Sequence, residues 1–447
     1  MRLEDCPDEI ISEVVNSLGL NDICNLRLSC KALAKKSMNP HFKTFFHSKH
    51  VDIKEDELQR LAQASQAGGL QCLVRELYLI GIAKDEDVEE NEYGDPNEER
   101  NVELLSKLFD SLAQHDNTAL LAISLRVIIV GSNRQRKKPA DVGMYGLKHI
   151  WQATADTFTT TLRALAASKL RIQSLNIFNG SDLQRCSLAS NLLNKIDWNS
   201  VSLAGSVSSL RTLSISLSNR VVKFYERGDD EDDFEEDTVS SIEQGSLGQS
   251  EFEEQLLAEA NDEGNFIGLA KFLSVCEYLE SFELHYLRVN NCVEIRIDPH
   301  HERLLQRVVN LDKLPKMNRC SLRGIIVRES DLLAFIKRTE PRELSLETVF
   351  LQSGKFASIF NYCTRKTTCI TRIYFDVLRE NERMIHFVEP GTHGIGEYSP
   401  MTKSRGVERE GTGVKQPLSY ITPPEVPTGS PEMANWVRFQ RSEYGTI

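Results

Sequence analysis

One short segment of the chain gathers residue types that bind metal ions. It runs Asp298-Pro299-His300-His301-Glu302, so two imidazoles lie between two carboxylates. A metal site needs such side chains to converge on one point, as they do from one face of a helix or from neighbouring strands. Adjacent histidines on a turn point apart, so the pattern favours a solvated turn. We therefore predict no metal ligands.

Two other segments have the composition of a functional site without its pattern. The glycine-rich stretch 391–396 lacks the residue order of a phosphate-binding loop, and no strand–turn–helix pattern surrounds it. The basic run from Arg134 to Lys138 is typical of a nuclear-import signal, an acidic-partner patch or a solvated loop, and the last is the most common. No aromatic residues interleave with it, so it does not predict nucleic-acid binding.

Signatures of catalysis are absent from the sequence. No G-x-S-x-G, H-E-x-x-H or G-x-x-x-x-G-K-[ST] motif occurs, and the ten cysteines include no C-x-x-C pair. We therefore predict that the chain is not an enzyme and has no catalytic residues and no cofactor. Scattered thiols, together with an N-terminus that lacks the apolar region of a secretory signal, predict reduced cysteines and a cytoplasmic or nuclear location.

The charge balance excludes two classes of partner. The 447 residues include 53 Lys and Arg against 65 Asp and Glu, a formal net charge of -12. Such a chain is repelled by nucleic acids and by anionic membranes. No run of about twenty apolar residues exists that would span a bilayer. We expect no nucleic-acid or membrane partner, so the expected partners are proteins.

Residues 7–47 predict a compact helical unit that would position any binding residues at this end of the chain. Pro7 suits a first helical turn, and the apolar residues that follow recur at helical spacing up to Gly19, a good helix stop. Asn21 and Asp22 are cap-type residues that would open a second helix, and a third would end near Asn39-Pro40. We expect Phe42, Phe45 and Phe46 to seal the base of the unit.

A unit of about forty residues buries too little apolar surface to be comfortably stable alone. It therefore needs a partner protein, the downstream part of the chain, or both.

The helical unit resembles the F-box. The matching residues, in the order and spacing of that motif, are Pro7, Glu9-Ile10, Val14, Leu18, Asp22-Ile23, Leu26-Arg27-Leu28 and Cys30-Lys31. Cys6 and Ile23 depart from it where leucine is usual, and both are apolar replacements. The stretch from Leu58 to Leu79 is also similar to fungal-type F-box proteins, in which a helix leads to a V-R-x-L-x-L strand.

The resemblance implies a substrate receptor of a Skp–cullin–F-box ubiquitin ligase. Such a protein docks on a Skp-type adaptor, through it on a cullin, and holds an unidentified protein target near the ubiquitin-carrying enzyme. The predicted adaptor-binding residues are Pro7, Ile10, Val14, Leu18, Leu26 and Leu28, although some of them can instead pack inside the unit. Two alternatives remain: an F-box interaction scaffold without a cullin, and an enzyme whose site has no familiar motif.

Downstream of the helical unit, one apolar pattern recurs at offsets 0, +3 and +5. Its occurrences are Val74/Leu77/Leu79, Ile172/Leu175/Ile177, Leu210/Leu213/Ile215, Leu279/Phe282/Leu284, Met317/Cys320/Leu322 and Ile370/Ile373/Phe375, with poorer matches at Leu344/Leu346 and Leu125-Val127-Ile129. Helical stretches lie between these, such as 104–112, 160–168 and 332–337. Recurring helix–strand units whose apolar faces need neighbours predict a solenoid. Because the spacing is irregular, an ordinary α/β domain remains the alternative.

The predicted fold class is therefore α/β, with an N-terminal three-helix F-box followed by an irregular leucine-rich-repeat-like α/β solenoid. The predicted domains are residues 1–50 and 51–388. Acidic stretches at 84–100 and 227–254 interrupt the second domain, and like-charge repulsion predicts that they are loops. Residues 389–447 are rich in Gly, Pro, Ser and Thr, which predicts a largely disordered tail.

Overall fold

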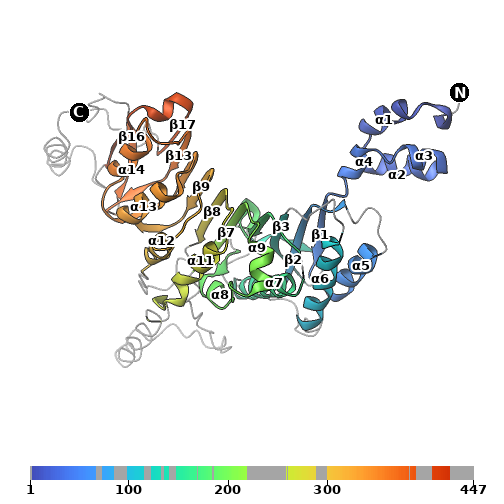
Figure 1. The fold of residues 1–447 in the computed structure, drawn as a ribbon, viewed down its shortest axis with the longest axis horizontal. Helices are drawn as coiled ribbons and strands as arrows, with labels where there is room; N and C mark the ends of the chain where they lie inside the picture. The colour runs from blue at the N-terminus through green and yellow to red at the C-terminus, as the bar shows by residue number, and fades with distance from the viewer. Residues whose placement is uncertain are drawn as a thin grey trace, which may run out of the picture. The chain divides into compact units, whose positions relative to one another are not determined.

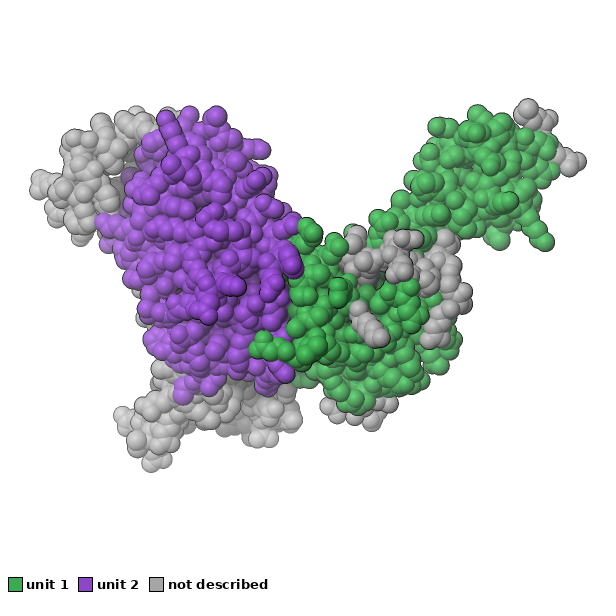
Figure 2. Space-filling view, viewed as in Figure 1, with its two compact units in different colours: residues 1–186, 199–213 green, residues 187–198, 214–447 purple. Residues whose placement is uncertain are grey.

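The computed structural model describes residues 3–66, 73–84, 98–114, 122–131, 135–139, 147–168, 170–183, 186–218, 258, 260–287, 300–381, 383–388 and 405–422. These residues form two compact units, coloured separately in Figure 2. Unit 1 comprises residues 1–186 and 199–213, and unit 2 comprises residues 187–198 and 214–447. The segment 227–254 and the glycine-rich stretch 391–396 lie outside the described residues, as does most of the stretch 84–100.

Unit 1 begins with short helices and continues with alternating strands and longer helices (Figure 1). Its elements are η1 (Leu3–Asp5), α1 (Asp8–Asn16), α2 (Leu20–Ser29), α3 (Lys31–Lys36), α4 (Pro40–Thr44), β1 (Ser48–Asp52), α5 (Glu55–Gln66), β2 (Glu76–Lys84), α6 (Glu98–Ala113), β3 (Ala122–Val130), β4 (Arg136–Lys137), α7 (Leu147–Ala167), β5 (Ser174–Ile177), η5 (Ser181–Leu183) and α9 (Val201–Val207). Strand β1 spans the predicted domain boundary between residues 50 and 51.

The strands β1, β2, β3 and β5 of unit 1 pair in parallel in that order, and β4 pairs antiparallel with β3. The register aligns the predicted apolar positions, since Ile123 pairs with both Leu77 and Leu175. All three side chains are buried. Helix α7 packs closely against β2, where a Cβ on Gly81 would collide with the hydroxyl of Thr157.

The strand expected at Leu125-Val127-Ile129, a poorer match to the apolar pattern, lies within β3. In the sheet, Ile123 and Leu125 pair with the +3 and +5 residues of β2 and β5. Strand β3 is nine residues long and buries every second side chain from Ile123 onward. Its longer apolar alternation obscured which two residues align with the neighbouring strands.

Unit 2 repeats the alternation of strands and helices with shorter elements. They are β6 (Leu188–Ala189), α8 (Ser190–Asn194), α11 (Gly264–Ser274), β8 (Ser281–Leu287), α12 (Arg303–Val309), β9 (Arg319–Arg323), β10 (Ile326–Arg328), α13 (Glu329–Thr339), β11 (Glu343–Glu347), β12 (Phe350–Ser353), α14 (Phe356–Cys363), β13 (Arg372–Asp376), β14 (Arg379–Glu380), β15 (Arg383–Met384), β16 (His386–Val388), β17 (Gly406–Glu410), η7 (Gly411–Lys415) and β18 (Ser419–Ile421). Strand β7 (Thr212–Ser218) contains the division between the units.

The main sheet is large and mostly parallel, with hydrogen-bonded strands in the order β1-β2-β3-β5-β7-β8-β9-β11-β13-β17. In unit 2 the buried residues Phe282, Cys320, Leu344 and Ile373 pair in register across β8, β9, β11 and β13. Each of the eight predicted strand segments therefore coincides with a strand. The expected helical stretches 104–112, 160–168 and 332–337 coincide with α6, α7 and α13.

A second, smaller sheet was not predicted. Strands β10, β12 and β14 pair in parallel, and β15 pairs antiparallel with β14. Each of the first three follows a main-sheet strand after a turn whose first residue has positive φ: Gly324 (75°), Thr348 (53°) and Val377 (51°). The N–H of Gly324 donates to the carbonyl of Glu347, and that of Thr348 donates to Asp376. Each of these two turns is thus hydrogen-bonded to the end of the next main-sheet strand, β11 or β13.

Part of the predicted tail is ordered. Residues 405–422 contain β17, which pairs antiparallel with β13, and β18, which pairs with β16. Val414 between them is fully buried. Composition alone gave no sign of this, because the order comes from backbone pairing with strands that are already formed.

Candidate adaptor-binding surface

The first helix of the N-terminal unit is shorter than predicted. Pro7 is its N-cap, with φ -53° and ψ 153°, and the carbonyl of Pro7 accepts the first helical hydrogen bond from the N–H of Ile11 (3.2 Å). The helix ends at Asn16, where both the N–H and the hydroxyl of Ser17 donate to the carbonyl of Val14. Gly19, predicted to end this helix, instead precedes α2 as its N-cap.

The unit contains four α-helices where three were predicted. Asn39 and Pro40 begin helix α4, because the side-chain Oδ1 of Asn39 accepts from the N–H of Phe42 (2.9 Å) and proline suits the first helical position. Asn21 and Asp22, predicted as caps, lie within the first turn of α2. Asn21 and Asp22 therefore lie near the start of the second helix, as predicted, but neither is its N-cap.

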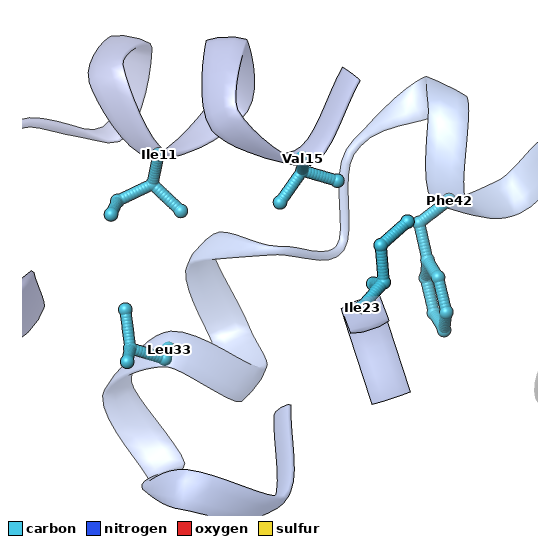
Figure 3. Packing of buried hydrophobic residues seen from close by; sticks show 5 residues of the cluster. All are labelled: Ile11, Val15, Ile23, Leu33 and Phe42. Atoms are coloured by element: carbon cyan, nitrogen blue, oxygen red, sulfur yellow. The ribbon is translucent and has the colours of Figure 1, made fainter. Parts of the chain in front are cut away.

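The N-terminal unit has a closed hydrophobic core. Figure 3 shows Ile11 and Val15 of α1 facing side chains from the other three helices. The core residues are Ile11, Val15, Ile23, Leu33 and Phe42, none more than 5% exposed. Phe46 packs edge-on against Phe42, whereas Phe45 is 38% exposed and contacts His41. Of the three aromatic residues predicted to seal the base, Phe45 does not.

Polar side chains tie the helices of this unit together. The Nδ2 of Asn39 donates to the hydroxyl of Ser12 (3.1 Å) and to the Oδ1 of Asn16 (3.0 Å). The Nζ of Lys36 donates to the carbonyl of Cys6 (2.6 Å) and lies 3.4 Å from the carboxylate of Asp8. These bonds fix α1 relative to α3 and α4, and with it the position of every residue on the outer face of α1.

The six predicted adaptor-binding residues divide into two groups. Pro7, Ile10 and Leu28 are exposed, with 51% of Ile10 and 84% of Leu28 accessible. Val14, Leu18 and Leu26 are half-buried, and the last two pack against the core. The first group is therefore available to a partner without repacking of the unit. The second group serves the unit's own fold at least in part.

Other exposed apolar residues of this unit were not predicted. Leu3 is 45% exposed and Met38 is 39% exposed, and Phe45 belongs with them. Because Leu3 and Met38 lie outside the α-helices, apolar residues at helical spacing do not include them.

The other candidate sites have structural roles. Glu302 is only 2% exposed and lies 3.2 Å from the guanidinium of Arg328 and 3.4 Å from the imidazole of His300, so the predicted solvated turn is wrong at Glu302. Arg136, from the basic run, lies in β4 and pairs with the buried carboxylate of Asp52 (2.7 Å). Within the described residues, no cluster of three or more His, Cys, Asp or Glu is arranged to hold a metal ion.

An open groove of about 720 Å³ lies beside the C-terminal ends of α11 and α13. Cys276 lines it, but burial raises the pKa of this thiol to about 12, so it cannot act as a thiolate nucleophile near neutral pH. Among the helices that the structure describes, none is both long and apolar enough to cross a bilayer.

Comparison with known protein families matches residues 3–45 to the F-box domain. No curated protein matches the chain. The matched range contains η1 to α4 and the five residues of the closed core. Residues 3–45 of this chain are therefore an F-box domain, which precedes a mixed α/β region.

Proposed function

We propose that this chain is the substrate receptor of a Skp–cullin–F-box ubiquitin ligase. The observation that carries the proposal is an F-box domain with a closed core that leaves Ile10 and Leu28 exposed. F-box domains generally belong to non-catalytic adaptors. The chain would bind a Skp-type adaptor and through it a cullin, in the cytoplasm or nucleus.

Exposed apolar side chains on two helices supply the driving force for adaptor binding. Fully burying a leucine or isoleucine side chain contributes roughly 1.5–3 kcal/mol. Leu28 has most of this contribution still available and Ile10 about half of it, because 84% and 51% of these residues are exposed. Half-buried Leu18 and Leu26 would line the base of the same surface.

The α/β region would hold the target protein. Its parallel strands, equivalent turns and intervening helices support an irregular leucine-rich-repeat-like solenoid, in which each unit covers the apolar face of the next. The receptor performs no chemistry on this account. It raises the local concentration of a target lysine beside the ubiquitin-carrying enzyme.

The test is adaptor capture by the full chain carrying Ile10→Asp and Leu28→Asp together. Both residues are exposed, so the substitutions leave the F-box core intact. We expect adaptor affinity to fall at least about a hundredfold, because two apolar contacts are replaced by buried charges. Val201→Asp is the matched control, since Val201 is 92% exposed and lies outside the F-box.

Unchanged adaptor capture by the double variant would refute the docking surface. A second measurement separates a ligase receptor from a scaffold, since the captured wild-type complex should also contain cullin. Adaptor without cullin would favour the scaffold.

A further inference from the structure

The two faces of the unit 2 sheet differ in character at β11, β13 and β17. Leu344, Leu346, Ile373 and Phe375 are buried on one face. The alternating residues on the opposite face are exposed or half-buried and mostly charged. The charged residues there are Glu343, Glu347, Arg372, Asp376, Glu408 and Glu410. On this face of the three strands, five carboxylates thus accompany one guanidinium, and Arg319 and Arg323 of the neighbouring strand β9 are the register partners of Glu343 and Glu347.

Two of these carboxylates face each other across neighbouring strands. Glu347 of β11 is the register partner of Asp376 of β13. Like charges directly opposite each other in a sheet destabilise it. Among the described residues neither carboxylate forms an ion pair, although Arg323 is the register partner of Glu347 on its other side. The register therefore places two carboxylates opposite each other on β11 and β13, with Arg323 beside Glu347 on the β9 side.

An exposed aromatic ring lies among these carboxylates. Tyr374 is 36% exposed, and its register partners are Ser345 of β11 and Glu408 of β17. Partial burial, together with the charges of Asp376, Glu347 and Glu408, raises the pKa of the Tyr374 phenol. Arg372 does not compensate them all, because its guanidinium is bound to Glu408 (2.7 Å). A ring beside carboxylates is the arrangement that attracts a lysine or arginine side chain.

We propose that this face, centred on Tyr374, Glu347 and Asp376, binds a lysine- or arginine-bearing segment of a partner protein. The inference rests on the proposed function, because the partner would be the target that the receptor holds. A basic side chain over Tyr374 would contact the ring and pair with Glu347 or Asp376. It would then lie against the two carboxylates that face each other across β11 and β13.

The experiment uses the full chain and a fluorescein-labelled eight-residue peptide of alternating lysine and serine, followed by fluorescence anisotropy. In Glu347→Gln with Asp376→Asn we expect affinity to fall about tenfold, as two exposed or half-buried ion pairs are lost. Glu277→Gln with Asp312→Asn is the matched control. It removes the same charge from exposed positions that line the groove beside α11 and α13, and should change affinity less than twofold.

The ring is tested separately. Tyr374→Ala should weaken peptide binding about threefold or more, whereas Tyr374→Phe, which keeps the ring, should stay within twofold of wild type. Equal losses in the two charge variants would overturn the proposal, because the peptide would then sense only bulk charge. So would the absence of peptide binding by wild type.

Adaptor capture is measured on the same variants. None of them alters the F-box, so capture should persist in all. Loss of peptide binding with retained adaptor capture therefore tests only the face around Tyr374. Loss of adaptor capture by the F-box variants tests only the proposed function.

Discussion

The guanidinium of Arg27 lies over the ring of Phe42, with its Cζ 4.4 Å from the ring centroid. The same guanidinium donates from Nη1 to the carbonyl of Ala34 (2.6 Å) and to the hydroxyl of Ser37 (3.3 Å). One side chain thus joins α2 to the end of α3 and to the aromatic residue of α4. The arginine of the F-box motif is therefore a structural element of the domain.

Replacing Arg27 with alanine should destabilise the F-box by about 2 kcal/mol, because the hydrogen bonds to Ala34 and Ser37 and a cation–π contact are lost together. Arg27→Lys should recover part of this, since it keeps the charge but not the forked geometry. Hydrogen exchange of the full chain measures the effect, as faster exchange in residues 8–44 with unit 2 unchanged. Wild-type protection of α2 to α4 in Arg27→Ala would contradict this role.

Equivalent turn positions should respond oppositely to substitution. Gly324 has a φ of 75°, and a Cβ there would collide with the carbonyl of Tyr286. Gly324→Ala should therefore lower the free energy of unfolding by about 2–3 kcal/mol. Thr348→Gly relieves the positive φ of a β-branched residue, so it should be neutral or stabilise by up to about 1 kcal/mol. Urea unfolding checks both, and a loss above about 1 kcal/mol in Thr348→Gly would count against the turn equivalence.

Protonation of His285 should lower the stability of the chain as the pH decreases from 6.5 to 4. Burial and then the charge of Arg323 lower the pKa of this imidazole from 6.5 to about 4. The unfolded chain binds the proton first, so the contribution of the neutral ring is complete above pH 6.5 and is lost toward pH 4. The loss is on the order of 3 kcal/mol.

Urea unfolding of wild type and His285→Asn across this pH range measures the effect of His285. The variant should show a shallower fall, because asparagine does not titrate but can keep a hydrogen bond with the hydroxyl of Ser216, which lies 3.0 Å from the ring. Parallel curves for the two proteins would rule out His285 as the titrating group.

Three buried thiols should resist alkylation in the folded chain. Burial raises the pKa of Cys276, Cys320 and Cys363 to about 12, so only about one thiol in ten thousand is ionised at pH 8. Cys369 is exposed. Iodoacetamide at pH 8, followed by peptide mass spectrometry, should label Cys369 at least a hundred times faster than the other three. Urea should abolish the difference, and native labelling of Cys320 as fast as Cys369 would disprove the burial argument.

The sequence determined where the F-box lies and where the eight strands with the recurring apolar pattern lie. The offsets 0, +3 and +5 marked strands because a main-sheet strand here buries alternate residues and the residue two positions before its start, as Leu279, Phe282 and Leu284 show. The order Pro7, Glu9-Ile10 and Leu26-Arg27-Leu28 located the F-box, since local spacing specifies its helices. Both patterns are local in the sequence, so they can be recognised without knowledge of the fold.

Tertiary structure alone decided which side chains are exposed and which are buried. Ile10 and Ile11 are adjacent and identical in type, yet the first is 51% exposed and the second fully buried, because only packing of α1 on the other helices separates the two faces. Glu347 and Asp376 are 29 residues apart in the chain, and only the register of β11 and β13 makes them neighbours. Pairing between distant segments depends on backbone hydrogen bonds that any sequence can form, so no local pattern encodes it.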